Sequence, residues 1–291
     1  MSSRSALAAL ALLVLATGCS SATAEPSSRK EADVPVVSSI GKEARRLVLP
    51  FDAYAISTPQ IHTIESAEDL LIRDCMREHG RGWKALPRPS GVDWDPSNRR
   101  RYGLIESEIA ARFGYHLPPA PQELTRREAA WDARKKLPEQ EQLAVFGKKG
   151  GGGCWKQAHE SLLRGIPQSD QSLFNRRIGE EFDASRRDSE VVRVVRNWSA
   201  CMKEKGFRYS APLTVTGDAR WGKSTRPSRR EITVAQADIR CKEKTDLVSV
   251  WAGVETRMQN DAIRSHSKEF RVLKAEKDQW LKAARRVLER G

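Results

Sequence analysis

Cysteines are the residues of this 291-residue chain that are best placed to do chemistry. Cys19 follows a short apolar run near the N-terminus, and the other four are Cys75, Cys154, Cys201 and Cys241. An even number of cysteines in an exported chain is typical of disulfide pairing, and four cysteines allow three connectivities. No two of them stand in the C-x-x-C spacing of a zinc site, so we predict neither a metal site nor a cofactor.

Residues 1–18 have the features of a secretory signal peptide. Arg4 supplies the positive charge, and the apolar run after it is shorter than the about 20 residues that span a bilayer. The segment that ends at Cys19 resembles a bacterial lipobox, although Ala16 stands where such segments usually have leucine. We therefore predict a lipid on Cys19, which would anchor the protein on the extracytoplasmic face of the cell membrane. The alternative is cleavage after Ala24, at an A-x-A sequence, which would release a secreted protein without a lipid.

The sequence around Cys75 is repeated around Cys201. Both segments read Cys-Met-basic-Glu-x-Gly, and an aromatic residue follows three positions after the glycine. We interpret each segment as the last turn of an amphipathic helix, which Gly80 or Gly206 ends in the left-handed conformation. The aromatic residue then folds back onto the core. The alternative is that the two copies build one paired functional site.

Each copy is followed by one more cysteine at the start of another predicted helix. We therefore predict the pairs Cys75–Cys154 and Cys201–Cys241, each joining two helices within its own half of the chain. Closing loops of these lengths stabilises a fold by roughly 4 kcal/mol per disulfide in the chain-entropy model. That is a large part of the about 5–15 kcal/mol that a domain normally has.

The elements that must position the cysteines are predicted to be helices. Apolar residues recur at helical spacing over residues 170–205 and from Arg229 to the end, with charged residues between them. A helix is also expected from Ser66 to Gly80, and Leu213–Thr216 is the only plausible strand. The fold class is therefore mainly α, a disulfide-braced helical bundle with a long C-terminal helix that either projects as a coiled-coil arm or folds back. Shorter helices are expected over residues 104–113, 122–136 and 138–146.

Composition divides the chain behind the signal peptide into three regions. Residues 19–45 hold the lipobox cysteine and a flexible tether rich in Ser, Ala, Pro and charge. Residues 46–211 form a helical region with the first disulfide and the first half of the second. Residues 212–291 consist of a loop and the long C-terminal helical region.

The segment Gly217–Ser224 satisfies the P-loop expression G-x-x-x-x-G-K-S. A P-loop also needs a buried parallel strand before it and a helix directly after it, whose N-terminus receives the phosphate. The following Thr225–Ser228 reads as a turn, and no hydrophobic strand ending in Asp is available to hold magnesium. We therefore predict a loop without nucleotide chemistry.

No catalytic set emerges from the other reactive side chains. The five histidines form no H-E-x-x-H pattern, and no G-x-S-x-G elbow is present. Asp238 and Glu255 lie on or near the apolar stripes of the C-terminal region, and a glycosidase uses two such carboxylates across a groove. Semi-buried acids paired with arginine are the commoner outcome, so we predict no catalytic residue.

The net charge restricts the partners. The chain has 51 Lys and Arg against 38 Asp and Glu, a formal net charge of +13, and loss of Arg4 with the signal peptide leaves +12. Basic clusters are scattered and alternate with acids, which is typical of a solvated surface; the alternative is a surface selected for an anionic partner. Outside a membrane that partner would be an anionic wall polymer or lipid headgroups, and we predict no nucleic-acid partner.

Several segments of the chain follow one shared pattern: Cys75-Met76, Gly153-Cys154-Trp155, Trp198–Met202, Gly206–Tyr209, Ala237-Asp238, Cys241-Lys242 and Val254-Glu255. With these segments the chain resembles a group of uncharacterised lipoproteins and secreted proteins of Streptomyces-like actinobacteria. The resemblance covers roughly residues 68–263, and it departs at Arg81, where an aromatic residue is common. It implies placement in the envelope and the cysteine pairing, and it implies no activity.

The sequence therefore predicts a non-catalytic lipoprotein of the cell envelope, held to the membrane by its N-terminal lipid, that binds anionic envelope components. A secreted hydrolase acting on cell-wall polymer is the alternative. Nothing in the residues names the ligand.

Overall fold

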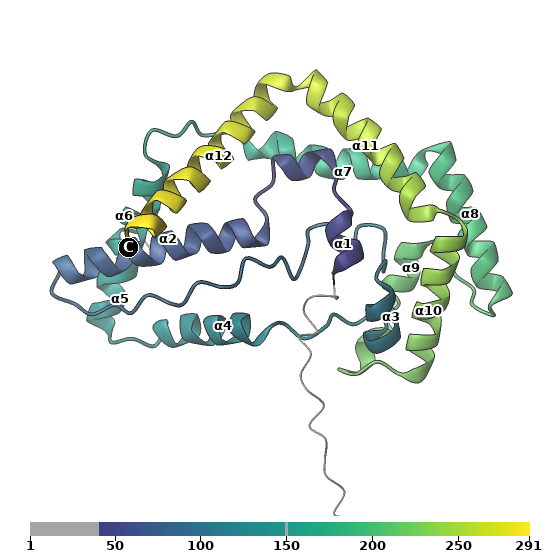
Figure 1. The fold of residues 1–291 in the computed structure, drawn as a ribbon, viewed down its shortest axis with the longest axis horizontal. Helices are drawn as coiled ribbons and strands as arrows, with labels where there is room; N and C mark the ends of the chain where they lie inside the picture. The colour runs from purple at the N-terminus through teal and green to yellow at the C-terminus, as the bar shows by residue number, and fades with distance from the viewer. Residues whose placement is uncertain (1–40, 149–150) are drawn as a thin grey trace, which may run out of the picture. The chain divides into compact units, whose positions relative to one another are not determined.

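Helices make up the regular structure of the protein (Figure 1). The structure is a computed structural model that describes residues 41–148 and 151–291, and no strand occurs within these two ranges. The prediction of a mainly α, disulfide-braced fold is therefore confirmed. The predicted signal peptide, the predicted lipid site at Cys19 and residues 20–40 lie outside the described residues.

The described elements follow one another as α1 (Lys42–Arg46), η1 (Pro50–Ala53), α2 (Thr58–Glu78), α3 (Ser107–Phe113), α4 (Gln122–Arg134), α5 (Glu139–Phe146), α6 (Gly153–Leu163), α7 (Gln171–Arg187), α8 (Ser189–Glu204), α9 (Pro212–Thr216), η2 (Trp221–Lys223), α10 (Arg229–Lys244), α11 (Leu247–Ser265) and α12 (Ser267–Arg290). None of these helices is long and apolar enough to cross a membrane.

Two helices begin earlier than the sequence indicated. The helix expected from Ser66 begins at Thr58, where the backbone N–H of Ser57 donates to Gln60 Oε1 at 2.9 Å and closes the first turn. Ser66 lies inside α2 and is buried. The helix α1 begins within the range predicted as tether, and its Ala44 is fully buried, so the chain is already packed from about this point.

The short run predicted as a strand is helical. Leu213–Thr216 belongs to α9, which begins with a proline at its first position and is stapled by a hydrogen bond from the Ala211 N–H to Thr214 Oγ1 at 3.3 Å. Proline suits the first turn of a helix, because its missing N–H would have no partner there. Four residues, three of them β-branched, are too few to distinguish a strand from a helix by periodicity, and the strand prediction was wrong.

Both glycine-terminated helix ends are as predicted. Gly80 follows α2 with φ +68°, and Gly206 follows α8 with φ +85°. The N–H of Arg81 donates to the Met76 carbonyl at 2.8 Å, and the N–H of Phe207 to the Met202 carbonyl at 2.9 Å. These are the six-to-one bonds of a Schellman motif, which satisfy carbonyls left open at a helix end. The aromatic residues that follow the two glycines pack against apolar clusters: Trp83 follows Gly80, and Phe207 and Tyr209 follow Gly206.

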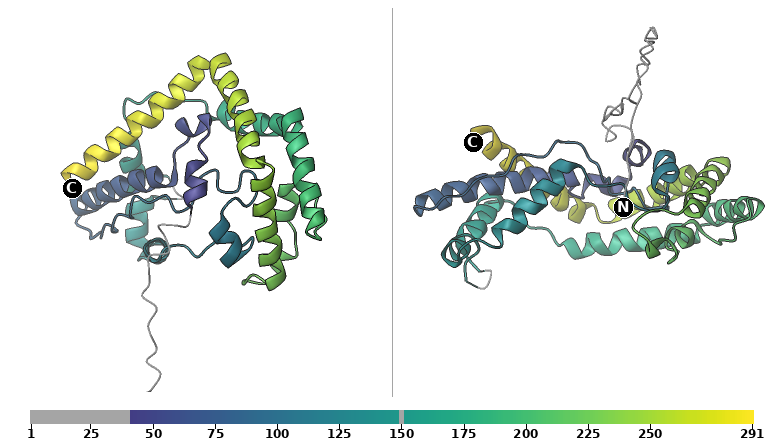
Figure 2. Two further views of the ribbon diagram at one scale, coloured as in Figure 1. Left: turned by 45° about the vertical axis from the view of Figure 1, so that its right-hand side comes forward. Right: turned by 90° about the horizontal axis from the view of Figure 1, so that it is seen from below.

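The C-terminal region folds back and does not project as an arm. The stripe predicted from Arg229 onward is divided into α10, α11 and α12 by turns at Asp246 and His266. Asp246 takes a left-handed conformation with φ +52°, which is uncommon for a residue other than glycine. The helix α12 then runs along α2, where Leu281 packs in one cluster with Ile64 (Figures 1 and 2).

Apolar side chains collect in four clusters. The largest, here the Trp198 core, joins α3, α8, α9, α10 and α11. The Phe270 cluster joins η1, α7, α11 and α12, and the Leu281 cluster joins α2, α6 and α12. The Met76 cluster joins α2, α5 and α6. Helices from the middle and the end of the chain thus share cores with helices from its first third.

Candidate functional site

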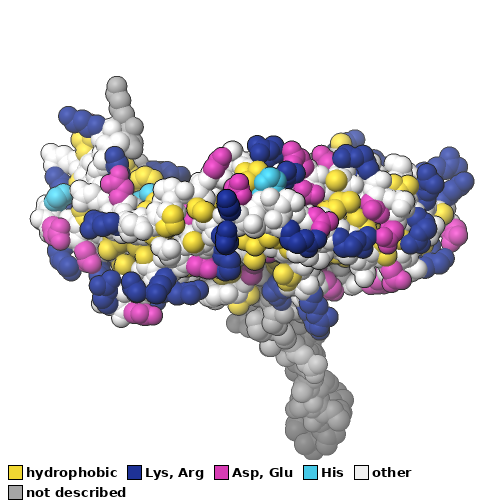
Figure 3. All heavy atoms as spheres, turned by 90° about the horizontal axis from the view of Figure 1, so that it is seen from above, with side chains coloured by type: hydrophobic (Ala, Val, Ile, Leu, Met, Phe, Trp, Pro, Cys, Tyr) yellow, Lys and Arg dark blue, Asp and Glu magenta, His cyan; other side chains and the backbone are white. Residues whose placement is uncertain are grey.

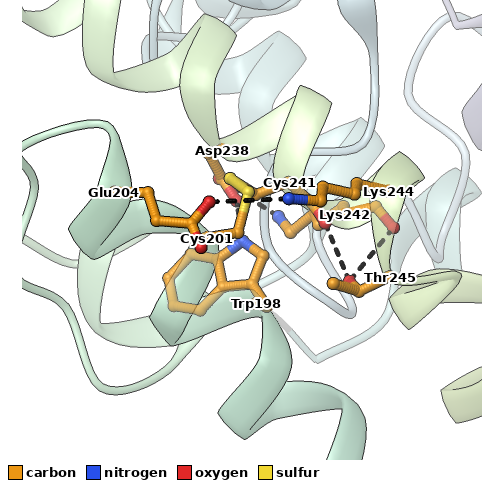
Figure 4. The surroundings of a disulfide bond; sticks show 8 residues. All are labelled: Trp198, Cys201, Glu204, Asp238, Cys241, Lys242, Lys244 and Thr245. Atoms are coloured by element: carbon orange, nitrogen blue, oxygen red, sulfur yellow. Dashed lines mark hydrogen bonds and ion pairs between the residues drawn. A yellow bond between two sulfur atoms is a disulfide. The ribbon is translucent and has the colours of Figure 1, made fainter.

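The cysteines pair as predicted. Cys75 and Cys154 are 2.03 Å apart at sulfur and join α2 to α6, and Cys201 and Cys241 are 2.01 Å apart and join α8 to α10. Figure 4 shows the second bond beside Trp198. The two repeated segments lie in different cores, the Met76 cluster and the Trp198 core. They are therefore two copies of a helix end and not one paired site.

The P-loop-like segment lacks the structure that phosphate binding requires. Gly217 caps α9, the short η2 follows, and α10 begins only at Arg229. No strand precedes Gly217 within the described ranges, and the helix whose N-terminus would receive phosphate is missing directly after Ser224. Ser224 instead offers its carbonyl to His116 Nε2 at 2.7 Å. The segment therefore lacks the strand–loop–helix arrangement of a P-loop.

Asp238 is fully buried and fully hydrogen-bonded. Its carboxylate accepts from Trp198 Nε1 at 2.9 Å, from Tyr115 Oη at 3.2 Å and from Lys242 Nζ at 3.1 Å. Lys242 Nζ also donates to the Leu104 carbonyl at 2.5 Å. Burial raises the pKa of Asp238 and lowers the pKa of Lys242, while the ion pair between them opposes both shifts. With 0 % of Asp238 exposed, the pair holds α10 in the core and meets no substrate.

Glu255 is bound in the same manner and, as the sequence indicated, it is paired with an arginine. It accepts from Arg101 Nε at 2.8 Å, from Tyr102 Oη at 2.8 Å and from Gln259 Nε2 at 2.9 Å, and its side chain is 0 % exposed. Burial, followed by the Glu255 charge, raises the pKa of Tyr102 well above its usual range. Neither Glu255 nor Asp238 is accessible, so these two acids do not form the open carboxylate pair that a glycosidase needs.

A pocket of about 620 Å³ lies between α2, α6 and α12, and we call it the basic pocket. Apolar side chains line part of it, and four cationic side chains line the rest. No acidic residue lines it. The lining residues are Leu71, Ser161, Leu162, Arg164, Ile166, Gln279, Lys282, Ala283, Arg286, Val287 and Arg290.

The cations of the basic pocket come from two helices. Lys282, Arg286 and Arg290 follow one another at intervals of four residues, which places them along one face of α12 over about 12 Å. Arg164 caps the C-terminus of α6. All four are exposed, and within the described ranges none of them forms an ion pair with an acidic side chain.

The rest of the surface has a different arrangement of charge. Figure 3 shows one face of the molecule, on which Lys and Arg side chains are spread out with Asp and Glu between them. One cation on α12 outside the pocket has such a neighbour: Lys274 Nζ lies 2.7 Å from Asp278. This agrees with the interpretation of a solvated surface. The basic pocket departs from it, because four cations gather there without acids.

A second pocket of about 400 Å³ lies against α1, α10 and α11. Its lining is mainly apolar and includes Leu47, Ile239 and Val248. The acids Glu43 and Glu243 also line it. Asp246 and the cations Arg46 and Lys242 line it as well, so this pocket carries charges of both signs, unlike the basic pocket.

Three potential metal ligands meet where the sequence indicated none. The ligand atoms of Cys75, His79 and Cys154 all lie within 4.8 Å of one another, and this is the one such group in the part of the chain that the structure describes. Cys75 and His79 stand one helical turn apart, so C-x-x-x-H within α2 was the signal that could have found them. Cys154 joins them only through the packing of α6 on α2.

Two of the other histidines, His116 and His159, each meet a carboxylate. His116 Nδ1 lies 2.8 Å from Glu231 Oε1, and the hydrogen bond to the Ser224 carbonyl, followed by the Glu231 carboxylate, raises the pKa of His116. His159 Nδ1 lies 2.7 Å from Glu68 Oε1 and its ring stacks on Trp155.

No family model matches this chain, and no curated protein and no solved structure matches it.

Proposed function

We propose that this chain is a non-catalytic protein of the cell envelope that binds a phosphate-bearing polymer in its basic pocket. This proposal rests on the pocket of about 620 Å³, which is lined by four cations and by no acid. The proposed position is the extracytoplasmic face of the membrane, with a lipid on Cys19 as anchor and release after Ala24 as the alternative. Both disulfides support export, because such bonds persist in oxidising compartments.

The geometry of the cations favours a polymer over a single small anion. Lys282, Arg286 and Arg290 extend over about 12 Å along α12, a length that repeated anionic groups would fill. Arg164 adds a fourth cation from the side of α6. Two unit charges 4 Å apart attract by about 4 kcal/mol at an effective dielectric constant of 20, so an anion in the pocket gains from several such contacts.

The apolar part of the pocket strengthens this interaction. Leu71, Leu162, Ile166 and Val287 lie beside the cations. Apolar walls displace water and lower the local dielectric constant, which makes each ion contact stronger than on an open surface. The proposed ligand is therefore a chain of repeated phosphates that contacts the cations in a pocket from which the apolar wall displaces water.

The hydrolase alternative has less support. Its two candidate acids, Asp238 and Glu255, are buried and engaged by three hydrogen-bonding partners each. A binding protein needs no such acids. We therefore retain binding as the proposed function.

The binding test uses the processed chain and labelled linear polyphosphate, followed by fluorescence anisotropy. We expect Lys282→Gln/Arg286→Gln to weaken the affinity by about 10-fold or more, because each lost charge-assisted hydrogen bond is worth roughly 1.5–3 kcal/mol. The matched control is Lys268→Gln/Arg285→Gln, which removes the same charge from the same helix outside the pocket and should have little effect.

The same experiment contains the results that would overturn the proposal. Equal losses in both double variants would show that net charge and not the pocket attracts the polymer. Binding of the unaltered chain should also weaken steeply as salt rises, because screening acts on exposed charges. If the chain does not bind polyphosphate but binds vesicles of phosphatidylglycerol, and not those of phosphatidylcholine, then it is a lipid-binding protein instead.

A further inference from the structure

The two disulfides differ in the surroundings of their sulfurs. Cys201 and Cys241 are only 4 % and 0 % exposed and belong to the Trp198 core. Cys75, in contrast, is partly exposed, while its partner Cys154 is fully buried. A reductant can therefore reach the first bond at the Cys75 sulfur, and it meets the second only after the core opens.

The imidazole of His79 lies beside the accessible disulfide. His79 is exposed, and within the described ranges its side chain has no hydrogen-bond or ion-pair partner. One of its ring nitrogens lies within 4.8 Å of both sulfurs. Gln157 Oε1 lies 3.4 Å from Cys75 Sγ and adds an oxygen on the α6 side. Sulfur, nitrogen and oxygen atoms thus lie close to Cys75 Sγ.

The ligands would remain near one another after the disulfide opened. His79 caps α2, and its N–H bonds to the Cys75 carbonyl at 3.2 Å, so these two residues keep their one-turn spacing. Cys154 is held by the Met76 cluster, in which α2, α5 and α6 also pack through Ile72 and Val145. This packing does not depend on the S–S bond.

We propose that reduction of the Cys75–Cys154 bond creates a Zn²⁺ site from the two thiolates and the imidazole of His79, a role that goes beyond polymer binding. A dithiol reductant supplies two electrons and two protons, the S–S bond breaks, two thiols form, and the reductant becomes a disulfide. Zn²⁺ then displaces the two thiol protons. Gln157 Oε1 or water completes the four ligands.

Zn²⁺ suits this donor set. It binds thiolate sulfur at about 2.3 Å and imidazole nitrogen at about 2.0–2.1 Å, usually with four ligands in a tetrahedron. Two thiolates and an imidazole also exclude the hard cations Mg²⁺ and Ca²⁺, which prefer oxygen. The ring of His79 has to approach the sulfurs by roughly 1 Å, which an exposed side chain reaches by rotation.

The second disulfide is an internal comparison. The side chains drawn around it in Figure 4 include Trp198, Glu204 and Lys244, and no histidine is among them. In the described part of the chain no group of three potential ligands includes Cys201 or Cys241. Reduction there would produce two thiols without a third ligand.

The test compares oxidised and reduced forms of the processed chain under anaerobic conditions. After reduction with a phosphine and its removal, Zn²⁺ affinity is measured by competition with a chromophoric chelator, and Co²⁺ is used to detect thiolate-to-metal charge transfer. We expect one Zn²⁺ per reduced chain and none per oxidised chain. His79→Gln should weaken the affinity by at least about 10-fold. His62→Gln, a histidine near the other end of α2, is the matched control and should have no effect.

Variants of the cysteines assign the site. Cys201→Ser/Cys241→Ser should retain the Zn²⁺ that appears on reduction, and Cys75→Ser/Cys154→Ser should lose it. A reduced chain without Zn²⁺, equal affinity in His79→Gln, or equal binding by the oxidised chain would each overturn the proposal. Because His79 is exposed, its variant leaves the fold intact and remains informative if a cysteine variant does not fold.

Discussion

At the scale of single residues, the buried charges hold the fold together. Asp238 accepts hydrogen bonds from Trp198, Tyr115 and Lys242, which come from three different parts of the chain. Lys242 is buried, and its ammonium contacts Asp238 and the Leu104 carbonyl. A buried charge that loses its partner is strongly unfavourable, because neither water nor a counter-ion replaces the lost contact.

We expect Asp238→Asn to lower the free energy of unfolding by about 3–5 kcal/mol, because the Lys242 ammonium then stays buried without its counter-charge. Urea unfolding followed by circular dichroism measures the loss. Asp238→Asn/Lys242→Met should cost less than the sum of its two single changes, since no uncompensated charge remains.

The matched control for this prediction is Asp261→Asn. Asp261 also pairs with a basic residue, Arg264, but its side chain is 65 % exposed. Exposed pairs contribute at most about 1 kcal/mol, so this change should be nearly neutral. Similar losses in Asp238→Asn and Asp261→Asn would show that the buried pair has no special role.

At the scale of elements, each helix ends where a local signal ends it. Gly80 and Gly206 take the left-handed conformation after α2 and α8. Asp188 separates α7 from α8 and accepts a hydrogen bond from the Glu190 N–H at 2.8 Å. These signals need only neighbouring residues, and they direct the chain after each cysteine helix back toward its core.

We expect Gly206→Ala to lower the free energy of unfolding by about 1–2 kcal/mol, because a side chain disfavours φ +85°. The control is Gly253→Ala in the exposed middle of α11, where a methyl group meets nothing within 4 Å. That change should raise stability by about 0.5–1 kcal/mol, because alanine favours helix. A methyl group at Gly206 also meets nothing within 4 Å, so a neutral result there would contradict the conformational argument.

At the scale of the whole molecule, the cysteine pairing and the net charge both fit the proposed export. The chain behind the predicted signal peptide would carry +12, and its four internal cysteines are joined in two bonds. The bonds join α2 to α6 and α8 to α10, so each stabilises a different core. Such a molecule suits an oxidising space next to anionic polymers.

We expect the mature chain to begin at Cys19, to carry the mass of a lipid and to fractionate with membranes. Intact-mass measurement of protein extracted from its own cells tests this, with an inhibitor of lipoprotein signal peptidase blocking the processing. Cys19→Ser should move the protein out of the membrane fraction, because the anchor is lost. An unmodified chain that begins at Glu25 would defeat the prediction of an anchor.

The sequence by itself determined the helical class, the two glycine helix ends and the rejection of the P-loop. Gly80 and Gly206 could be assigned because the conformation they adopt depends on a few neighbouring backbone bonds. The cysteine pairing followed from the repeat around Cys75 and Cys201. The strand expected at Leu213–Thr216 failed for the converse reason, since so short a run has no decisive local preference.

Only the tertiary structure decided which side chains share a site. Arg164 meets Lys282 and Arg286 because α6 and α12 pack on α2, and Cys154 reaches His79 through the same packing of α6. Helix caps and turns depend on adjacent residues, because the hydrogen bonds that form them are local. A pocket between helices depends on how faces more than a hundred residues apart fit together, and no local pattern encodes that fit.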